Sequence, residues 1–471
     1  MWRKALGFLG AMACGLALAP TAAHGQFPPP GGGFGMPPGP GMMPPGPGVM
    51  IPPRPGMPPT PGMPASMGMP PGAFGHPGAT GIPADFPNPG MPSQEKVSPF
   101  SIKDEGMPNA FSELVDPRLC RPIRWQISAG YTFLWFNQGK YPPLATTGSL
   151  ADAVPGALGQ PGTIVLSTER TPGMSSAFRT TFTYWLLDPE ALSLDANFFI
   201  MENRSVINYF QSDETGFPLL ARPYFNVVGR QEGAELRSAP GISKGTMFDS
   251  VTTRLMGAEV NLTCRTASIY EGAMLNFLVG VRWLRLDERF SSHDTTADLG
   301  GVGTSFTFAD EFATRNQFIG GQLGGEWMYR VARFTFAMHG KLAIGPNYQS
   351  VDISGQTNAT NLITTANVTD DQGLYAQPTN VGTYRQVKTT YLPEFGARIA
   401  IDLSDRCRFN VGYNFLWLNH AVRPGDQMDR SINIQPLLAP TITPPLVPAP
   451  PTFQQSTFTA HMLNLSLEFM Y

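Results

Sequence analysis

From residue 123 onward, apolar side chains recur at every second position, with polar or small residues between them. The first such row is Ile123, Trp125, Ile127, Ala129, Tyr131, Phe133 and Trp135. Successive side chains of a β-strand point to opposite faces, so a period of two predicts a strand with one apolar and one polar face. The row covers 123–135, which is longer than the roughly five to six residues typical of strands in globular proteins.

The same pattern returns in nine later segments, which we predict to be strands: 178–186, 192–200, 256–262, 275–283, 319–329, 334–344, 391–401, 409–417 and 463–471. The connections alternate in length. The short ones are 187–190, 265–271, 330–333 and 402–406, and the long ones are 137–176, 203–252, 289–313, 346–387 and 420–456. Short turns at one end and long loops at the other are the arrangement of outer-membrane barrels. The sequence therefore predicts an all-β fold, a transmembrane antiparallel β-barrel of ten strands whose short turns face the periplasm.

A soluble β-sandwich would also alternate apolar and polar positions, but three features favour the membrane barrel. The strands are long, aromatic residues lie near the ends of the apolar rows, and the alternate face mixes charges, amides and glycines. Aromatic girdles and a polar interior are typical of outer-membrane barrels. Twelve strands remain an alternative to ten, because 163–168, 218–228 and 348–355 could extend strands or add a pair.

The first 118 residues lack this pattern and divide into two parts. Residues 1–25 have the form of a secretory signal, with Arg3 and Lys4 before an apolar run and a small-x-small site at 23–25. Residues 26–118 are a low-complexity arm, which between 27 and 92 holds 23 Pro, 16 Gly and 9 Met. Such a composition cannot bury enough apolar surface to fold. We therefore predict a disordered arm in the periplasm and an outer-membrane barrel at 119–471.

Charge and cysteine content limit the partners and cofactors. The formal net charge is −3, and loss of the signal removes two cations, which argues against a nucleic-acid partner. The mature chain keeps Cys120, Cys264 and Cys407 at spacings that match no zinc pattern, so no metal or other cofactor is predicted. A Cys264–Cys407 bridge and isolated thiols both remain open.

Charged residues on the polar faces are predicted to face the barrel lumen: Arg124, Arg179, Asp195, Glu259, Arg282, Glu326, Lys341, Glu394, Arg398 and Arg408. These nearly balanced charges are expected to pair, because an unpaired buried charge costs several kcal/mol. A barrel of about ten strands is only slightly wider than the eight-stranded kind that side chains can fill. The residues themselves therefore favour a narrow or plugged lumen.

The last strand has apolar residues at alternate positions back from the C-terminus: Leu463, Leu465, Leu467, Phe469 and Tyr471. A strand edge with an aromatic terminus is similar to the signal that barrel-assembly machinery reads in outer-membrane proteins. We therefore expect two partners, the outer-membrane lipids and this machinery.

Two polar segments are candidates for chemistry at the barrel mouth. In the loop after the ninth strand, Arg423, Asp426, Asp429 and Arg430 lie around a Pro-Gly-Asp turn signal and could fold back over the mouth. The loop would then be a constriction or gate, or else a cap without a role in transport. A hydrolytic enzyme would need a base there, which His293-Asp294 and the preceding acidic pair 287–288 could supply. No wider motif surrounds them, so we predict a solvated loop and no enzyme.

Six short segments, in order along residues 125–471, resemble a known family. They are 141–148 (YPPLATTG), 156–163 (GALGQPGT), 220–226 (LARPYFN), 314–318 (TRNQF), 412–416 (GYNFL) and 422–427 (VRPGDQ). Together they resemble the seventh putative beta-barrel porin family of planctomycete bacteria. The resemblance implies an outer-membrane barrel with a pore, and it brings no catalytic or ligand-binding residues. The expected function is passive passage of small hydrophilic solutes or ions. The alternative is a closed barrel that is structural or binds partners through its long extracellular loops.

Overall fold

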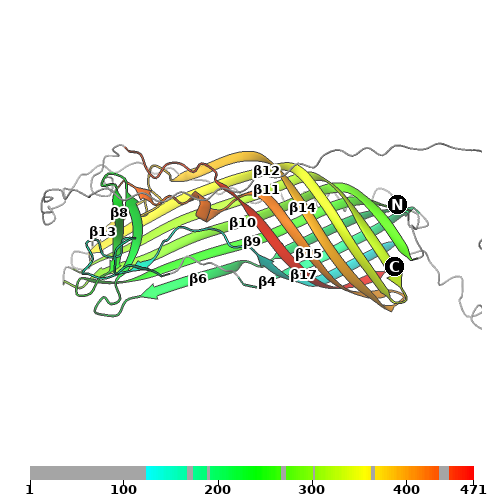
Figure 1. Ribbon diagram of the computed structural model, residues 1–471, viewed down its shortest axis with the longest axis horizontal. Coiled ribbons are helices and arrows are strands. Elements are labelled where there is room, and N and C mark those ends of the chain that lie inside the picture. Colours follow the sequence, from blue (N-terminus) through cyan, green and yellow to red (C-terminus); the bar gives the residue numbers. More distant parts are fainter. Residues whose placement is uncertain are drawn as a thin grey trace, which may run out of the picture. The chain divides into compact units, whose positions relative to one another are not determined.

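The computed structural model describes residues 124–166, 173–187, 191–266, 272–300, 303–361, 366–433 and 445–471 (Figure 1). The predicted signal segment 1–25, the predicted arm 26–118 and Cys120 all lie outside the described residues. Among the described residues, no helix has the length and apolar character needed to cross a membrane.

Ten antiparallel strands close into a ring. In chain order they are β1 (Trp125–Phe136), β4 (Ser175–Leu187), β5 (Leu192–Met201), β9 (Ser243–Arg265), β10 (Ala273–Asp298), β11 (Thr304–Val331), β12 (Phe334–Asn361), β14 (Gly382–Ser404), β15 (Cys407–Val422) and β17 (Gln455–Met470). Each pairs with its neighbours along β10-β11-β12-β14-β15-β17-β1-β4-β5-β9, and β9 pairs with β10 to complete the circuit. The predicted ten-stranded barrel is confirmed.

The first and last strands of the barrel form its seam. Gln126 lies opposite Met470 and Phe136 opposite Ala460. Beyond the last paired residue, the Tyr471 ring stacks on Trp125 with centroids 4.5 Å apart. We call this end, which carries the short turns and the C-terminus, the inner end, and the opposite end the outer end (Figure 1).

Several strands are much longer than predicted. The strands β9 to β12 have 23–28 residues, so most of 289–313 and much of 203–252 and 346–387 are strand, and their prediction as loops was wrong. Two further strands, β6 (Arg204–Gln211) and β13 (Ala366–Asp370), pair with the outer parts of β9 and β12. The extension of β12 includes 348–355, one of the segments left open from the sequence.

The outward face of β10 shows where the lipid-facing band ends. Phe277, Val279 and Val281 are exposed apolar side chains, as contact with lipid requires. Farther toward the outer end the outward positions become charged, beginning with Arg285 and Asp287, which form an ion pair of 2.7 Å. The remaining outer part of the strand therefore stands beyond the membrane.

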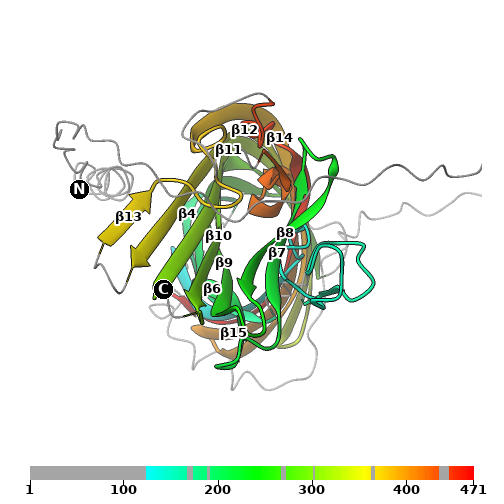
Figure 2. The same cartoon turned by 90° about the vertical axis from the view of Figure 1, so that its left-hand side faces the viewer.

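A second, five-stranded sheet is built from the connections at the outer end. It comprises β2 (Thr146–Thr147), β3 (Ile164–Val165), β7 (Leu220–Asn226), β8 (Gln231–Ser238) and β16 (Ser431–Ile432). Figure 2 looks onto this end and shows β7 and β8 beside the strands of the ring. The segments 163–168 and 218–228 thus add strands to this sheet and none to the ring.

Two large apolar clusters lie inside the barrel, and a small third cluster joins Ala145, Leu220 and Met247. One, which we call the sealing layer, takes side chains from every strand of the ring: Leu134, Phe136, Ala177, Phe199, Met201, Leu255, Leu284, Leu286, Phe318, Ala343, Leu392, Leu416, Leu418, Ala421, Phe458, Ala460 and Met462. The other, the outer cluster, joins side chains of the ring to side chains of the connections: Leu144, Val251, Phe290, Phe312, Val351, Ile353, Leu374, Tyr375, Ala376, Val422, Met428 and Ile432.

Candidate functional site

The inward side chains of β10 contribute to each layer of the lumen in turn, from the inner end to the outer end. From the inner end, Asn276 lines a polar cavity and Arg282 belongs to a buried ionic layer. Leu284 belongs to the sealing layer. Phe290 belongs to the outer cluster, and Asp294 is bound by arginines of the connections. Successive inward residues lie about 6.8 Å apart along a strand, so these are separate layers along the barrel.

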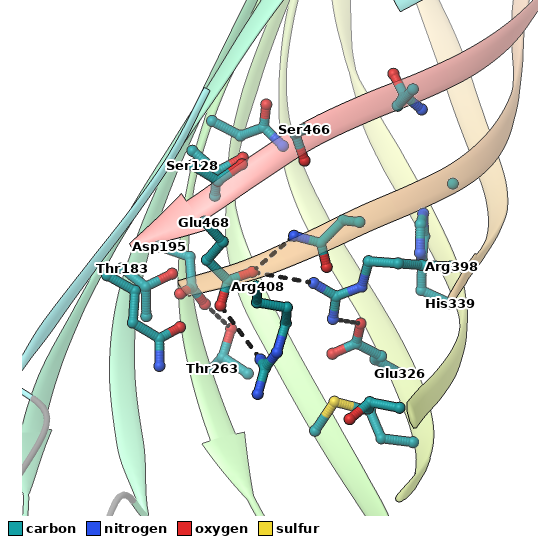
Figure 3. Close-up of a pocket in the computed structure, with 18 of the residues that line it drawn as sticks. Ser128, Thr183, Asp195, Thr263, Glu326, His339, Arg398, Arg408, Ser466 and Glu468 are labelled. Atoms are coloured by element: carbon teal, nitrogen blue, oxygen red, sulfur yellow. Dashed lines mark hydrogen bonds and ion pairs between the residues drawn. The ribbon is translucent and has the colours of Figure 1, made fainter. Parts of the chain in front are cut away.

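The cavity at the inner end has a volume of about 390 Å³ and is lined by side chains of all ten strands. One side, which we call the paired wall, carries charges that neutralise each other (Figure 3). Arg398 Nη2 lies 3.2 Å from Glu326 Oε1. Arg408 lies 3.3 Å from Glu468 and 2.6 Å from Asp402. This wall comes from β11, β14, β15 and β17.

The facing side, which we call the hydroxyl wall, is formed by β1, β4, β5 and β9. Its lining is mainly hydroxyls and amides, including Ser128, Thr181, Thr183, Ser193, Asn197, Asn261 and Thr263. Asp195 lies among them and accepts hydrogen bonds from the Ser193 and Thr263 hydroxyls. Deeper in the cavity, Arg179 Nε donates to Asn197 Oδ1 over 3.2 Å.

An ionic layer closes the outer end of this cavity. Arg282 pairs with Glu394, Lys341 Nζ lies 2.5 Å from Glu259 Oε1, and Gln322 Nε2 donates to Glu259 over 3.0 Å. The side chains of Arg282, Glu259 and Glu394 are all less than 10% exposed. Because removing one partner of a buried pair costs about 3–5 kcal/mol, this layer resists being dismantled.

The sealing layer then blocks the lumen. Leu134, Phe318, Leu392 and Leu416 from four different strands are each 0% exposed. Apolar side chains packed across the interior leave no hydrated path, and a pore for small solutes needs one. The lumen is therefore closed in this structure.

Beyond the sealing layer, the connections plug the outer half through two buried arginines. Arg222 on β7 donates to both oxygens of Asp294, over 2.8 and 2.6 Å, and to Asp249 over 2.8 Å. Arg237 on β8 donates to Asp294 over 2.8 Å and stacks on the Phe308 ring. Burial disfavours the ionised carboxyl of Asp294, but the two guanidiniums outweigh this and hold its pKa below the usual value.

The mouth loop contributes a second anchor. Arg423 is 3% exposed and binds Glu288 on β10 through two nitrogens, over 2.9 and 2.6 Å. Residues Pro424–Gln427 form the short 3-10 helix η1. Asp426 accepts a hydrogen bond from Ser456 Oγ over 2.6 Å, and Arg430 pairs with Glu232 over 2.6 Å.

These positions can be compared with the predicted site residues. Seven of the predicted charges line the cavity: Arg179, Asp195, Glu259, Glu326, Lys341, Arg398 and Arg408. Arg282 and Glu394 lie in the ionic layer. Arg124 is exposed at the start of β1, where its N–H donates to the carbonyl of Tyr471. In the mouth loop, Asp429 accepts the backbone N–H of Ser431.

The C-terminal residues lie on β17. The side chains of Leu467, Phe469 and Tyr471 are exposed on its outward face, and those of Leu463 and Leu465 are half-buried.

Residues 289–294, which include His293 and Asp294, were predicted as a solvated loop, and this was wrong: they are part of β10. Glu288 and Asp294 are both 2% exposed. His293 is exposed and Asp294 is buried, so the two side chains point to opposite faces of the strand. The partners Arg222 and Arg237 were missed from the sequence. The one available signal was an arginine directly after the apolar run 219–221.

Cys264 and Cys407 are both free thiols, the first exposed and the second half-buried. The bridge left open from the sequence is absent between these two described residues.

Similar folds occur among solved structures. The crystal structure of the outer membrane protease OmpT from Escherichia coli is 8% identical over 74% of this chain and 97% of that chain, with a TM-score of 0.34. The Pseudomonas putida toluene transporter TodX is 9% identical over 74% and 90%, with a TM-score of 0.15. A Pseudomonas aeruginosa FadL homologue is 7% identical over 73% and 89%, with a TM-score of 0.18. TM-scores this low say nothing about function, and no curated protein matches the sequence.

A family model described as "Putative beta barrel porin-7 (BBP7)" matches residues 127–471, from the first strand of the ring to the C-terminus. The match covers most of the chain and all ten strands. The protein is therefore a porin-like outer-membrane β-barrel and belongs to the beta barrel porin-7 family.

Proposed function

We propose that this barrel passes small hydrophilic solutes or ions only after an opening transition, and that the structure is its closed state. The observation that carries the proposal is the composition of the outer half. Half of the side chains in the outer cluster come from connections. These connections are held to the ring by Arg222 and Arg423 and can move without dismantling the ring. The charged cavity supports the same function, because a polar lining suits hydrophilic solutes.

Opening would require two events. The arginine-anchored connections would have to leave Asp294 and Glu288, and the sealing layer would have to part. The buried ion pairs make the first step costly, so we expect the closed form to dominate at rest.

Recording single channels from the purified protein in planar bilayers tests this proposal. We expect long closed periods with rare, discrete conductance steps. The Asp294→Ala variant should open more often, because it removes the carboxylate shared by Arg222 and Arg237 and leaves Arg222 with Asp249 alone. The control is Asp352→Ala, since Asp352 is exposed and accepts one hydrogen bond from Thr383.

A second candidate is a permanently closed barrel that displays its outer half at the cell surface. The specific observation in its favour is that all ten strands contribute to the sealing layer. Silence of both wild type and Asp294→Ala over a wide voltage range, with the proteins shown to be folded, would favour this candidate over passage.

The proposal is for a non-enzymatic protein. His293 and Asp294, considered as a hydrolytic pair, face opposite sides of β10 and cannot act on one substrate. We also propose that the arm at 26–118, after a cleaved signal at 1–25, lies in the periplasm. Outer-membrane barrels have their short turns on that side, and β1 begins at the same end as the short turns.

We propose two further partners. The exposed apolar band of the strands supports contact with outer-membrane lipids. The pairing of β17 with β1 at the seam supports recognition of the last strand by barrel-assembly machinery.

A further inference from the structure

The charges that line the inner cavity differ in how they are neutralised. On the paired wall, Arg398 and Arg408 contact Glu326 and Glu468 at ion-pair distance. At the outer end of the cavity, Lys341 is paired with Glu259. These charges are satisfied by the protein itself, so they offer little to a ligand.

Arg179 and Asp195 on the hydroxyl wall are different. The described part of the chain brings no oppositely charged side chain within 4 Å of either residue, and Arg179 interacts with Glu394 of the ionic layer only at longer range. Arg179 lines the cavity and donates through Nε to the amide oxygen of Asn197, and its two terminal nitrogens make no hydrogen bond to the described residues. Asp195 accepts from two hydroxyls, those of Ser193 and Thr263. Neither contact neutralises a charge.

The strand register sets the distance between these two charges. On the paired strands β4 and β5, Arg179 lies opposite Phe199 and Asp195 lies opposite Thr183. The two residues are thus four positions apart along the pair, which is about 13 Å of backbone. Asp195 is nearer the inner end, and Arg179 lies deeper. The long arginine side chain can shorten the separation between the charges.

We infer that the inner cavity binds a small zwitterion, with its ammonium group at Asp195 and its carboxylate at Arg179. A guanidinium fork suits a carboxylate, and a carboxylate flanked by hydroxyls suits an ammonium group. An extended peptide spans about 3.3–3.6 Å per residue, so a peptide of about three residues matches the spacing. The cavity of about 390 Å³ falls within the range of small-molecule sites.

Equilibrium binding tests this site and does not depend on whether the barrel conducts. Trialanine is titrated into the full-length protein in detergent micelles and followed by calorimetry. The two matched ligands are N-acetyl-trialanine, which lacks the ammonium group, and trialanine amide, which lacks the carboxylate. We expect each matched ligand to bind at least about tenfold more weakly than trialanine, because a hydrogen bond to a charged group is lost.

Substitutions of Arg179 and Asp195 test which residue binds the carboxylate of the ligand and which binds its ammonium group. Arg179→Met should weaken trialanine about tenfold or more and leave trialanine amide unchanged, since the amide has no carboxylate to lose. Asp195→Asn should weaken trialanine and leave N-acetyl-trialanine unchanged, and Arg179→Lys should restore part of the binding. The control is Arg289→Met, an exposed residue paired with Glu311 outside the lumen.

The inference is overturned if trialanine gives no saturable binding to the folded wild-type protein. It is equally overturned if all three ligands bind alike, which would mean that the two charges are not used. The wild-type comparison of the three ligands needs no variant, so misfolding of a variant cannot decide the result. Conductance silence with selective trialanine binding would reject the proposed passage and keep the binding site.

Discussion

The inner half of the barrel interior is polar and holds a cavity, whereas the outer half is packed like the core of a soluble domain. In the inner half, the charged side chains belong to the ring itself: Glu326 on β11 pairs with Arg398 on β14, across the intervening strand β12. In the outer half, Asp294 of the ring is bound by Arg222 and Arg237, which come from a connection. The cavity remains where charged and polar side chains of the ring line the lumen. It ends at the sealing layer of the ring, and the connections fill the lumen beyond that layer.

This difference shows what determines whether the interior of a narrow barrel is open or filled. The same ten strands run through both halves, so strand number alone does not decide whether the interior is filled. The sealing layer, made wholly by the ring, shows that apolar side chains close the lumen without help from connections. Where the inward side chains of the same ring are charged and pair with one another, as Arg398 does with Glu326 and Arg408 with Glu468, the lumen keeps a cavity.

Deleting Phe469–Tyr471 should have the largest effect, and it acts on the inner half. These residues pair with the start of β1 and place the Tyr471 ring on Trp125. We expect the truncated protein to fail in assembly and to accumulate in the periplasm. The measurement is heat-modifiable mobility of the outer-membrane fraction. The single substitution Tyr471→Phe should assemble normally, and normal folding of the truncation would contradict the assembly role.

Asp294→Ala attacks the outer half. It leaves Arg237 without its closest carboxylate and Arg222 with Asp249 alone. Breaking a buried ion pair costs about 3–5 kcal/mol, so we expect amide exchange in β7 and β8 to accelerate strongly while the inner strands keep their protection. Hydrogen exchange with mass spectrometry measures both regions at once. Equal protection of β7 in the variant and in Asp352→Ala would show that the arginines do not anchor the connections.

Leu392→Ala tests the boundary between the two halves. Leu392 is 0% exposed in the sealing layer, and removal of a buried leucine side chain costs about 2–5 kcal/mol. The matched control is Leu342→Ala, because Leu342 is 45% exposed on the outward face of β12, where lipid fills the vacated space. Thermal unfolding in micelles should show the larger loss for Leu392→Ala. Similar losses for both would mean that the layer is loosely packed.

The lipid-facing part of the fold could be predicted from the sequence, because lipid imposes an apolar outward face. Val279 and Val281 alternate with inward Gly280 and Arg282, and this alternation marked the strand. Beyond the membrane the outward positions of β10 become polar, as at His293, and its inward positions mix the apolar Phe290 with the charged Glu288 and Asp294. The apolar alternation therefore ends although the strand continues.

The outer part of the site could not be predicted for a different reason. Arg222 and Asp294 are 72 residues apart in the sequence. The residues around each of them contain no pattern that identifies the other as its partner. The charges of the cavity could be predicted, because they lie on membrane-spanning strands. In these strands the apolar residues mark the lipid-facing side, and the residues between them must face the lumen. Arg124 was placed by the same rule, but it lies at the strand end, where the alternation no longer determines a side chain's surroundings.

Asp310 gives the outer half a pH dependence opposite in sign to that of Asp294. Its carboxylate is 4% exposed on β11 and accepts the backbone N–H groups of Leu374, Tyr375 and Ala376, over 3.2, 3.0 and 2.7 Å. Burial raises the pKa of this carboxyl, although the N–H groups oppose the shift, and nearby Asp294 raises it further while Arg222 lowers it. The folded state therefore favours the protonated form. Its stabilising contribution is complete below the ordinary pKa of about 3.9 and is lost as pH rises through the raised pKa.

We therefore expect the segment 371–381 to hold to the ring more tightly in mild acid than at neutral pH. The effect is the smallest of the four, at about 1.4 kcal/mol for each unit by which the pKa is raised. Exchange of the Leu374, Tyr375 and Ala376 amides, corrected for the intrinsic effect of pH, measures it. Asp310→Asn should remove the dependence, and Asp371→Asn at a neighbouring exposed position should preserve it. If Asp310→Asn keeps the wild-type pH dependence, another group governs the stability of the outer half. Asp294 would show the opposite sign, because a carboxyl with a lowered pKa loses its stabilising contribution only as pH falls.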